Sequence, residues 1–107
     1  MKNHTKLSNA NKWERRALSA ERIYLFHTKI ARNVARIRKE RGISQLDLAL
    51  SIGHKSVSLV SGAESGYNGI HFNLEQLYRI AHALEVPMID FFDGVGEVDI
   101  DSQSYDE

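Results

Sequence analysis

The chain has 107 residues, of which 42% are hydrophobic and 26% are charged, and it contains no cysteine. This length is typical of one domain with a small core, and the lack of cysteine excludes disulfide frameworks and thiolate metal sites. No apolar run approaches the ~18–20 residues that span a bilayer, and the N-terminus carries no apolar signal region, so we expect a cytoplasmic protein with no membrane partner.

The formal net charge is zero, but the charges are segregated along the chain. Residues 1–22 hold six Lys or Arg against two Glu, a net +4, whereas residues 93–107 hold six acids and no base. The segment 29–41 has six bases and one acid, which is either a local positive face or an ordinary solvated helix surface. The sequence predicts a basic extension (1–22), a folded domain (23–92) and a flexible acidic tail (93–107).

The first predicted element is one long amphipathic helix over residues 20–41. Its apolar positions are three or four residues apart (Ile23, Phe26, Ile30, Val34, Ile37), and Gly42 ends it. Upstream, the single Trp13 is predicted to pack on the domain or on a partner chain, because a disordered tail rarely needs a tryptophan.

Two short helices follow, joined by a turn at Gly53. Ser44 is predicted to cap the first of them, and its buried side is predicted to comprise Leu46, Ala49, Leu50 and Ile52. Ser56 is predicted to cap the next helix, with Val60 and Ala63 facing inward and Val57, Ser58, Ser61 and Gly62 facing outward. Helices this short need neighbours to hold a core, and together they form a helix-turn-helix whose second helix suits a DNA major groove.

The last predicted elements complete an all-α fold. A loop over residues 65–72 leads to a helix over 74–84, which Asn73 caps and which has an apolar stripe of Leu74, Leu77, Ile80, Ala81 and Leu84. Pro87 then fits the first turn of a fifth short helix that ends at Phe92. No strand pattern is visible in the sequence.

The pattern resembles the phage repressor/Cro (Xre) family of helix-turn-helix proteins. The residues that carry the resemblance are Val34-Ala-Arg-Ile-Arg38, Gly42-Ile-Ser-Gln45, Leu48-Ala49, Gly53, Val60-Ser61, Glu64, Gly66 and the segment Leu77 to Val86. It covers about Ile30 to Phe92 and implies a five-helix, repressor-like bundle. The spacing from Gly53 to Glu64 is one residue longer than is usual in the family, so the register of the third helix is anchored on Glu64.

The resemblance implies a sequence-specific regulator of transcription that binds double-stranded DNA, a repressor acting as a homodimer. The residues predicted to contact DNA are Gln45, His54, Lys55, Ser56, Val57, Ser58, Ser61, Gly62, Tyr67 and Asn68. Arg38 and Glu64 are predicted to form an ion pair, the alternative being two unrelated surface charges. The predicted dimer contacts are Met88, Ile89, Phe91 and Phe92, unless one of the adjacent phenylalanines lies in the core and the other is half-exposed.

Other chemistry finds little support in the sequence. The five histidines are scattered without metal-ligand spacing, and no nucleophile motif or phosphate-binding loop is present, so we expect no enzyme activity, metal or cofactor. The competing hypothesis is an antitoxin or a restriction–modification controller that also binds a partner protein. The flanking segments 1–22 and 93–107 are the candidate partner-binding regions.

Overall fold

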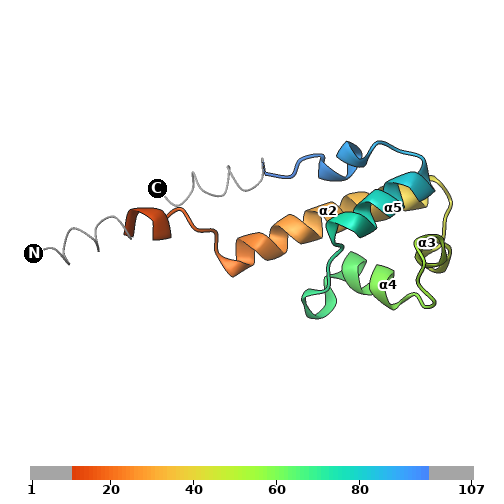
Figure 1. Cartoon of the computed structure of the whole chain (residues 1–107), viewed down its shortest axis with the longest axis horizontal. Coiled ribbons are helices and arrows are strands. Elements are labelled where there is room, and N and C mark those ends of the chain that lie inside the picture. The colour runs from red at the N-terminus through yellow and green to blue at the C-terminus, as the bar shows by residue number, and fades with distance from the viewer. Residues whose placement is uncertain (1–10, 97–107) are drawn as a thin grey trace, which may run out of the picture.

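The computed structural model describes residues 11–96, and every regular element in that range is helical. Its elements are α2 (Ala20–Glu40), α3 (Gln45–Ser51), α4 (Ser58–Ser65), the 3₁₀ helix η1 (Tyr67–Gly69), α5 (Leu74–Leu84) and the 3₁₀ helix η2 (Met88–Phe92). α3, α4 and η1 lie on one side of the layer formed by α2 and α5, and η2 lies on the other (Figure 1). This arrangement confirms the predicted all-α helix-turn-helix bundle.

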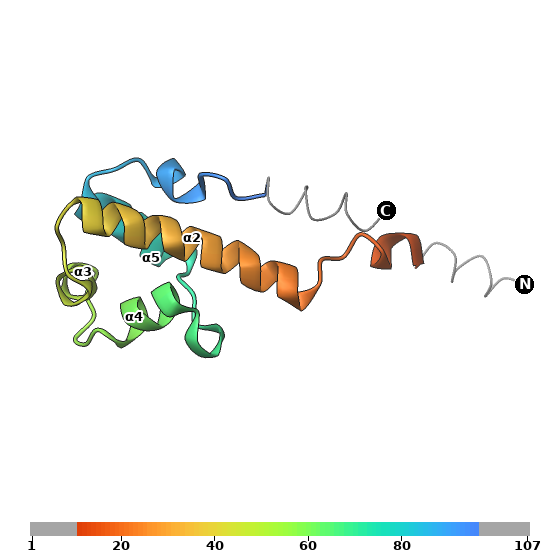
Figure 2. The same ribbon diagram turned by 180° about the vertical axis from the view of Figure 1, so that it is seen from behind.

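The long helix α2 is the axis of the molecule. Ser19 caps it by accepting a hydrogen bond from the Arg22 backbone N–H at 3.1 Å. The second half of α2 buries Ile30, Val34 and Ile37. The first half projects beyond the helix-turn-helix (Figure 2), which leaves Ile23 exposed although it continues the same apolar stripe.

The start of α3 was predicted correctly, but its buried side was not. Ser44 caps α3 through the Asp47 backbone N–H at 3.0 Å, as predicted. Leu46 and Leu50, however, are 47% and 53% exposed, and Leu48 packs in the core beside Ala49 and Ile52. A seven-residue helix with leucines on several sides has no unique apolar stripe, so its contacts with α4 and α5 decide which leucine is buried.

Helix α4, the third predicted helix, starts one residue later than predicted, and its buried side comprises the predicted Val60 and Ala63 together with Gly62. Val57 is its N-cap and no side chain caps it, because Ser56 lies in a longer turn and its hydroxyl accepts from the Ser58 N–H at 3.4 Å. Gly62 is buried, whereas it was predicted to face outward. A Cβ at Gly62 would lie 2.9 Å from Cδ1 of Ile70, so the missing side chain makes room for the returning chain.

The C-terminal helices close the bundle. Asn73 and Gln76 form a capping box at the predicted start of α5, but Leu74 is 71% exposed and does not belong to the buried stripe. Leu74 stays exposed because the first turn of α5 lies beyond the edge of the core. Pro87 precedes the last element, which is a 3₁₀ helix and not an α-helix.

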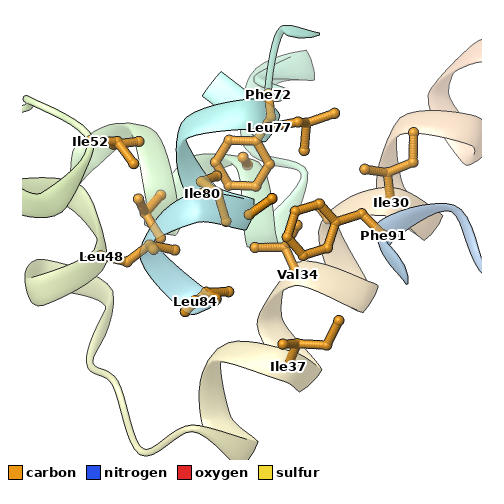
Figure 3. Close-up of a cluster of buried hydrophobic side chains, with 14 of the residues drawn as sticks. Ile30, Val34, Ile37, Leu48, Ile52, Phe72, Leu77, Ile80, Leu84 and Phe91 are labelled. Atoms are coloured by element: carbon orange, nitrogen blue, oxygen red, sulfur yellow. The ribbon is translucent and has the colours of Figure 1, made fainter. Parts of the chain in front are cut away.

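One hydrophobic core joins α2, α3, α4, α5 and η2. In Figure 3 the Phe91 ring of η2 lies beside Val34 of α2, and Ile80 and Leu84 of α5 face Leu48 of α3. Trp13 takes no part in this core. It is exposed, and Lys12 and Arg16 lie over its ring at 5.7 and 5.0 Å from the centroid, so the predicted packing of Trp13 on the domain is wrong.

Candidate nucleic-acid interface

A buried ion pair fixes α4 to α2. The Arg38 Nε lies 2.8 Å from Glu64 Oε2, and its Nη2 donates to Glu64 Oε1 at 2.9 Å. Both side chains are only 8% exposed, and the remaining guanidinium nitrogen, Nη1, donates to the Ile43 carbonyl at 2.7 Å. The predicted pair is therefore present and is bidentate, which is the strongest geometry for an arginine and a carboxylate.

The same carboxylate positions the first residue of α3. The Gln45 Nε2 donates to Glu64 Oε1 at 2.8 Å, and Gln45 remains partly exposed at the N-terminus of the helix. An amide nitrogen carries two N–H groups, so one of them stays available for an external acceptor such as a phosphate. Glu64 of α4 thus fixes the first residue of α3 and Arg38 of α2 relative to each other.

A shallow groove lies beside this network, and α2 forms its basic wall. The groove, called the basic groove below, is lined by Arg32, Ala35, Arg36, Lys39 and Glu40 of α2 together with Gln45, Ser61, Glu64 and Ser65. The three bases are exposed, and Glu40 lies 3.5 Å from Arg36 in a solvated pair. Exposed pairs of this kind are weak, so the wall keeps most of its positive charge.

These three bases belong to the segment 29–41, which was predicted to be either a positive face or a solvated helix surface, but none of them was predicted as a DNA contact. Their spacing of four and then three residues places Arg32, Arg36 and Lys39 on one side of a helix. That spacing was available in the sequence. Gln45 and Ser61 come near these bases only when the chain folds, and the three bases together with them form a candidate phosphate site.

The outer side of α4 has the predicted small, weakly polar character. Ser58 is exposed, Val57 and Ser61 are partly exposed, and His54, Lys55 and Ser56 form the turn that precedes them. This turn starts at Gly53, whose φ of +91° is a left-handed conformation that favours glycine. Gly62 lies on the opposite, buried side and is excluded from this surface.

The loop after α4 exposes the other predicted polar contacts. Gly66 ends α4 with a φ of +71°, and η1 then presents Tyr67 and Asn68 to solvent. Asn68 also has a positive φ of +57°, which asparagine tolerates better than most residues. η1 lies on the same side of the molecule as α3 and α4 (Figure 1).

Two stacked histidines join this loop to α2. The rings of His27 and His71 are 3.6 Å apart between centroids and nearly parallel, at 12°. Burial, and then the neighbouring His71, lower the pKa of His27 below its ordinary value of 6.5. Both causes therefore favour the neutral form of the His27 ring.

The predicted dimer contacts divide into buried and exposed residues. Phe91 is completely buried and cannot contact a partner, whereas Ile89 is 71% exposed and Met88 and Phe92 are partly buried. The alternative prediction, with one phenylalanine in the core and the other half-exposed, is therefore correct. η2 turns one ring into the core and leaves the other at the surface.

Comparison with known proteins supports the architecture. A family model described as helix-turn-helix matches residues 34–91, from the second half of α2 to Phe91 of η2. No curated protein sequence matches the chain. Within residues 11–96, no helix has the length and apolar character of a membrane span, and no three His, Cys, Asp or Glu side chains gather as a metal site would require.

Proposed function

We infer the function of this chain from its membership of the helix-turn-helix family, the family of Xre/Cro/CI-type repressors, whose members are DNA-binding regulators. We propose that it is a sequence-specific transcriptional repressor that binds double-stranded DNA as a homodimer. The observation that supports this best is the Arg38–Glu64–Gln45 network, since it holds α4 rigidly with its outer side exposed beside the basic groove. The DNA-binding domain would comprise residues 23–92, flanked by the basic extension and the acidic tail.

Affinity would come from contacts with the phosphates on both sides of α4. The proposed phosphate contacts are Gln45, Lys55, Ser61, Tyr67 and Asn68, and the bases of the basic groove join them. Lys55 is exposed at the turn before α4, and the groove places Arg32 and Arg36 near Gln45. A protein that neutralises several phosphates shows a steep decrease of affinity with salt.

Specificity would rest on few base contacts. His54, Ser56, Val57 and Ser58 are the proposed readers, with Val57 suited to a thymine methyl and Ser58 to several bases. None of them makes the bidentate contacts of Arg, Asn or Gln. Sequence-dependent shape and deformability of the DNA would therefore supply part of the selectivity.

Dimerisation would use the exposed apolar residues of η2. Ile89 is exposed and Met88 and Phe92 are partly exposed, and Ile89 and Phe92 line a pocket that also contains charged side chains such as Arg36 and Asp90. A two-fold dimer places two α4 helices on half-sites about one DNA turn apart. The operator is then expected to be a palindrome.

A second candidate function has one structural observation in its favour. The projecting first half of α2 and the segment before it expose Trp13, Leu18, Tyr24 and Leu25, which is more apolar surface than DNA binding requires. A controller or antitoxin would use this surface to bind a partner protein. Purification with a second protein in a stable complex would favour this function over that of a plain repressor.

Binding-site selection on the purified full chain, followed by a salt titration, tests the main proposal. We expect a palindromic site and a log Kd that rises steeply with log salt concentration, whereas a slope near zero would exclude phosphate-driven binding. Lys55→Ala should weaken binding to all duplexes alike, while Arg79→Ala on α5, whose side chain pairs with Glu75, should leave it unchanged. Ser58→Ala should change the preference at one base position and leave the fold intact.

A further inference from the structure

The end of the described chain is anchored to α2. Asn33 is buried in α2, and its Nδ2 donates to the carbonyls of Phe91 at 2.9 Å and Asp93 at 3.0 Å. Immediately afterwards Gly94 lies against the Lys29 side chain, since a Cβ at Gly94 would be 3.1 Å from the Lys29 Cε. The backbone therefore leaves the fold at a defined place, alongside the basic wall of α2.

The surface at this exit is partly apolar and basic. Gly94, Val95 and Gly96 line a cavity of about 180 Å³ together with Leu25, Phe26, Lys29 and Arg32. Leu25 is exposed, and Arg32 belongs both to this cavity and to the basic groove. One surface of α2 thus runs from the exit point to the candidate phosphate site.

The remaining chain has the complementary composition. Residues 97–107 contain five acids, namely Glu97, Asp99, Asp101, Asp106 and Glu107, and no base. Val98 and Ile100 alternate with the first three acids, so an extended segment would have one apolar and one acidic side. Eleven residues reach up to about 36 Å. Lys29 to Lys39 spans only about 15 Å of helix, so the whole basic wall is within reach.

We propose that residues 97–107 bind Lys29 and the basic wall of α2 (Arg32, Arg36 and Lys39) in the same chain and compete with DNA phosphates for the wall. This proposal rests on the proposed function, because the basic groove is the site for which both anions compete. Val98 and Ile100 cover the apolar cavity beside Gly96, and the carboxylates pair with Lys29 and Arg32. The tail acts as an internal anion that any duplex must displace before its phosphates bind the wall.

Physical chemistry favours a tethered competitor at this site. A short covalent connection gives a ligand an effective concentration of the order of millimolar, so weak carboxylate–guanidinium pairs are enough for partial occupancy. These pairs are exposed and screened by salt, so the competition is strongest at low ionic strength. The competition weakens every duplex whose phosphates must displace the tail, and random DNA is the simplest probe of it because its binding depends almost wholly on phosphate contacts.

The test compares the full chain with a full-length variant that carries E97Q, D99N, D101N, D106N and E107Q. We expect the neutralised chain to bind random duplex DNA about tenfold more tightly at about 50 mM salt, with the difference vanishing near 0.5 M. Glu75→Gln, which removes an exposed acid on α5, serves as the control and should change affinity by less than about twofold. Equal affinity of the neutralised and parent chains overturns the proposal.

A second measurement separates docking from simple repulsion and from failure of the proposed function. NMR spectra without DNA should show shifts at Lys29 and Arg32 between the parent and neutralised chains, and none at Glu75. Tighter DNA binding without these shifts means that the tail only repels DNA, and this overturns the docking. Shifts in a protein that binds no duplex would uphold the docking and refute the proposed function instead.

Discussion

Replacing Arg38 of α2 by Met removes the cation that pairs with Glu64 of α4, the residue that also binds Gln45 of α3. The guanidinium makes two hydrogen bonds to Glu64 and one to the Ile43 carbonyl, and both charged side chains are only 8% exposed. In Arg38→Met the Glu64 carboxylate stays buried and keeps the hydrogen bond from the Gln45 amide. Removing one member of a buried ion pair destabilises a protein by about 3–5 kcal/mol, which lowers the Tm of a small domain by at least about 12 °C.

The assay is urea and thermal unfolding followed by circular dichroism, within a double-mutant cycle. Glu64→Leu alone should destabilise the fold similarly, whereas Arg38→Met/Glu64→Leu removes both charges and should lose less than the sum, with a coupling of about 2 kcal/mol. The exposed pair of Arg79 with Glu75 is the control, with an expected coupling below about 0.5 kcal/mol. A coupling near zero for the buried pair would refute the assignment of Glu64 as the residue that positions α3 and α4.

Three further predictions concern the supports of the DNA-facing side. Since the pKa of His27 is lowered in the fold, stability should decrease as the pH falls below about 6.5 towards that lowered pKa, and His27→Gln should lose this part of the pH dependence in unfolding titrations. Gly66→Ala should destabilise by about 1–2 kcal/mol or more, because φ is +71° and the new Cβ would lie 2.6 Å from the Tyr24 hydroxyl; an unchanged urea midpoint would contradict this. Asn73→Ala removes the capping box of α5 and should reduce the unfolding free energy by about 1 kcal/mol, whereas the exposed Leu74→Ala should have a smaller effect.

Local chemistry made much of the fold predictable. Ser44 and Asn73 cap helices where their side chains suit a first turn, and both caps form as predicted. The long spacing pattern of Ile30, Val34 and Ile37 identified the buried side of α2 because a helix of 21 residues repeats its periodicity several times. The Arg38–Glu64 pair followed from the family resemblance, since no local rule relates residues 26 positions apart.

The candidate site was predicted less completely, for the same reason. Ser58 and Lys55 are exposed as predicted. The bases of the basic groove were recognised as part of a basic segment but not as DNA contacts, because that role depends on Gln45 and Ser61, which only folding brings near. Gly62 was assigned to the outer side of α4 because no local feature of the sequence indicates that Ile70 packs on it.

The sequence by itself determined which segments are helical, where most of them begin and how charge is distributed, since these depend on neighbours within a few residues. Tertiary structure decided which leucine of α3 is buried, which of Phe91 and Phe92 enters the core, and that Leu74 stays outside it. A helix of two turns, or a 3₁₀ turn, presents apolar groups in several directions, and all of them satisfy local rules equally well. Only the shape of the space left by α2 and α5 distinguishes between them, and that space does not exist until the distant segments have packed together.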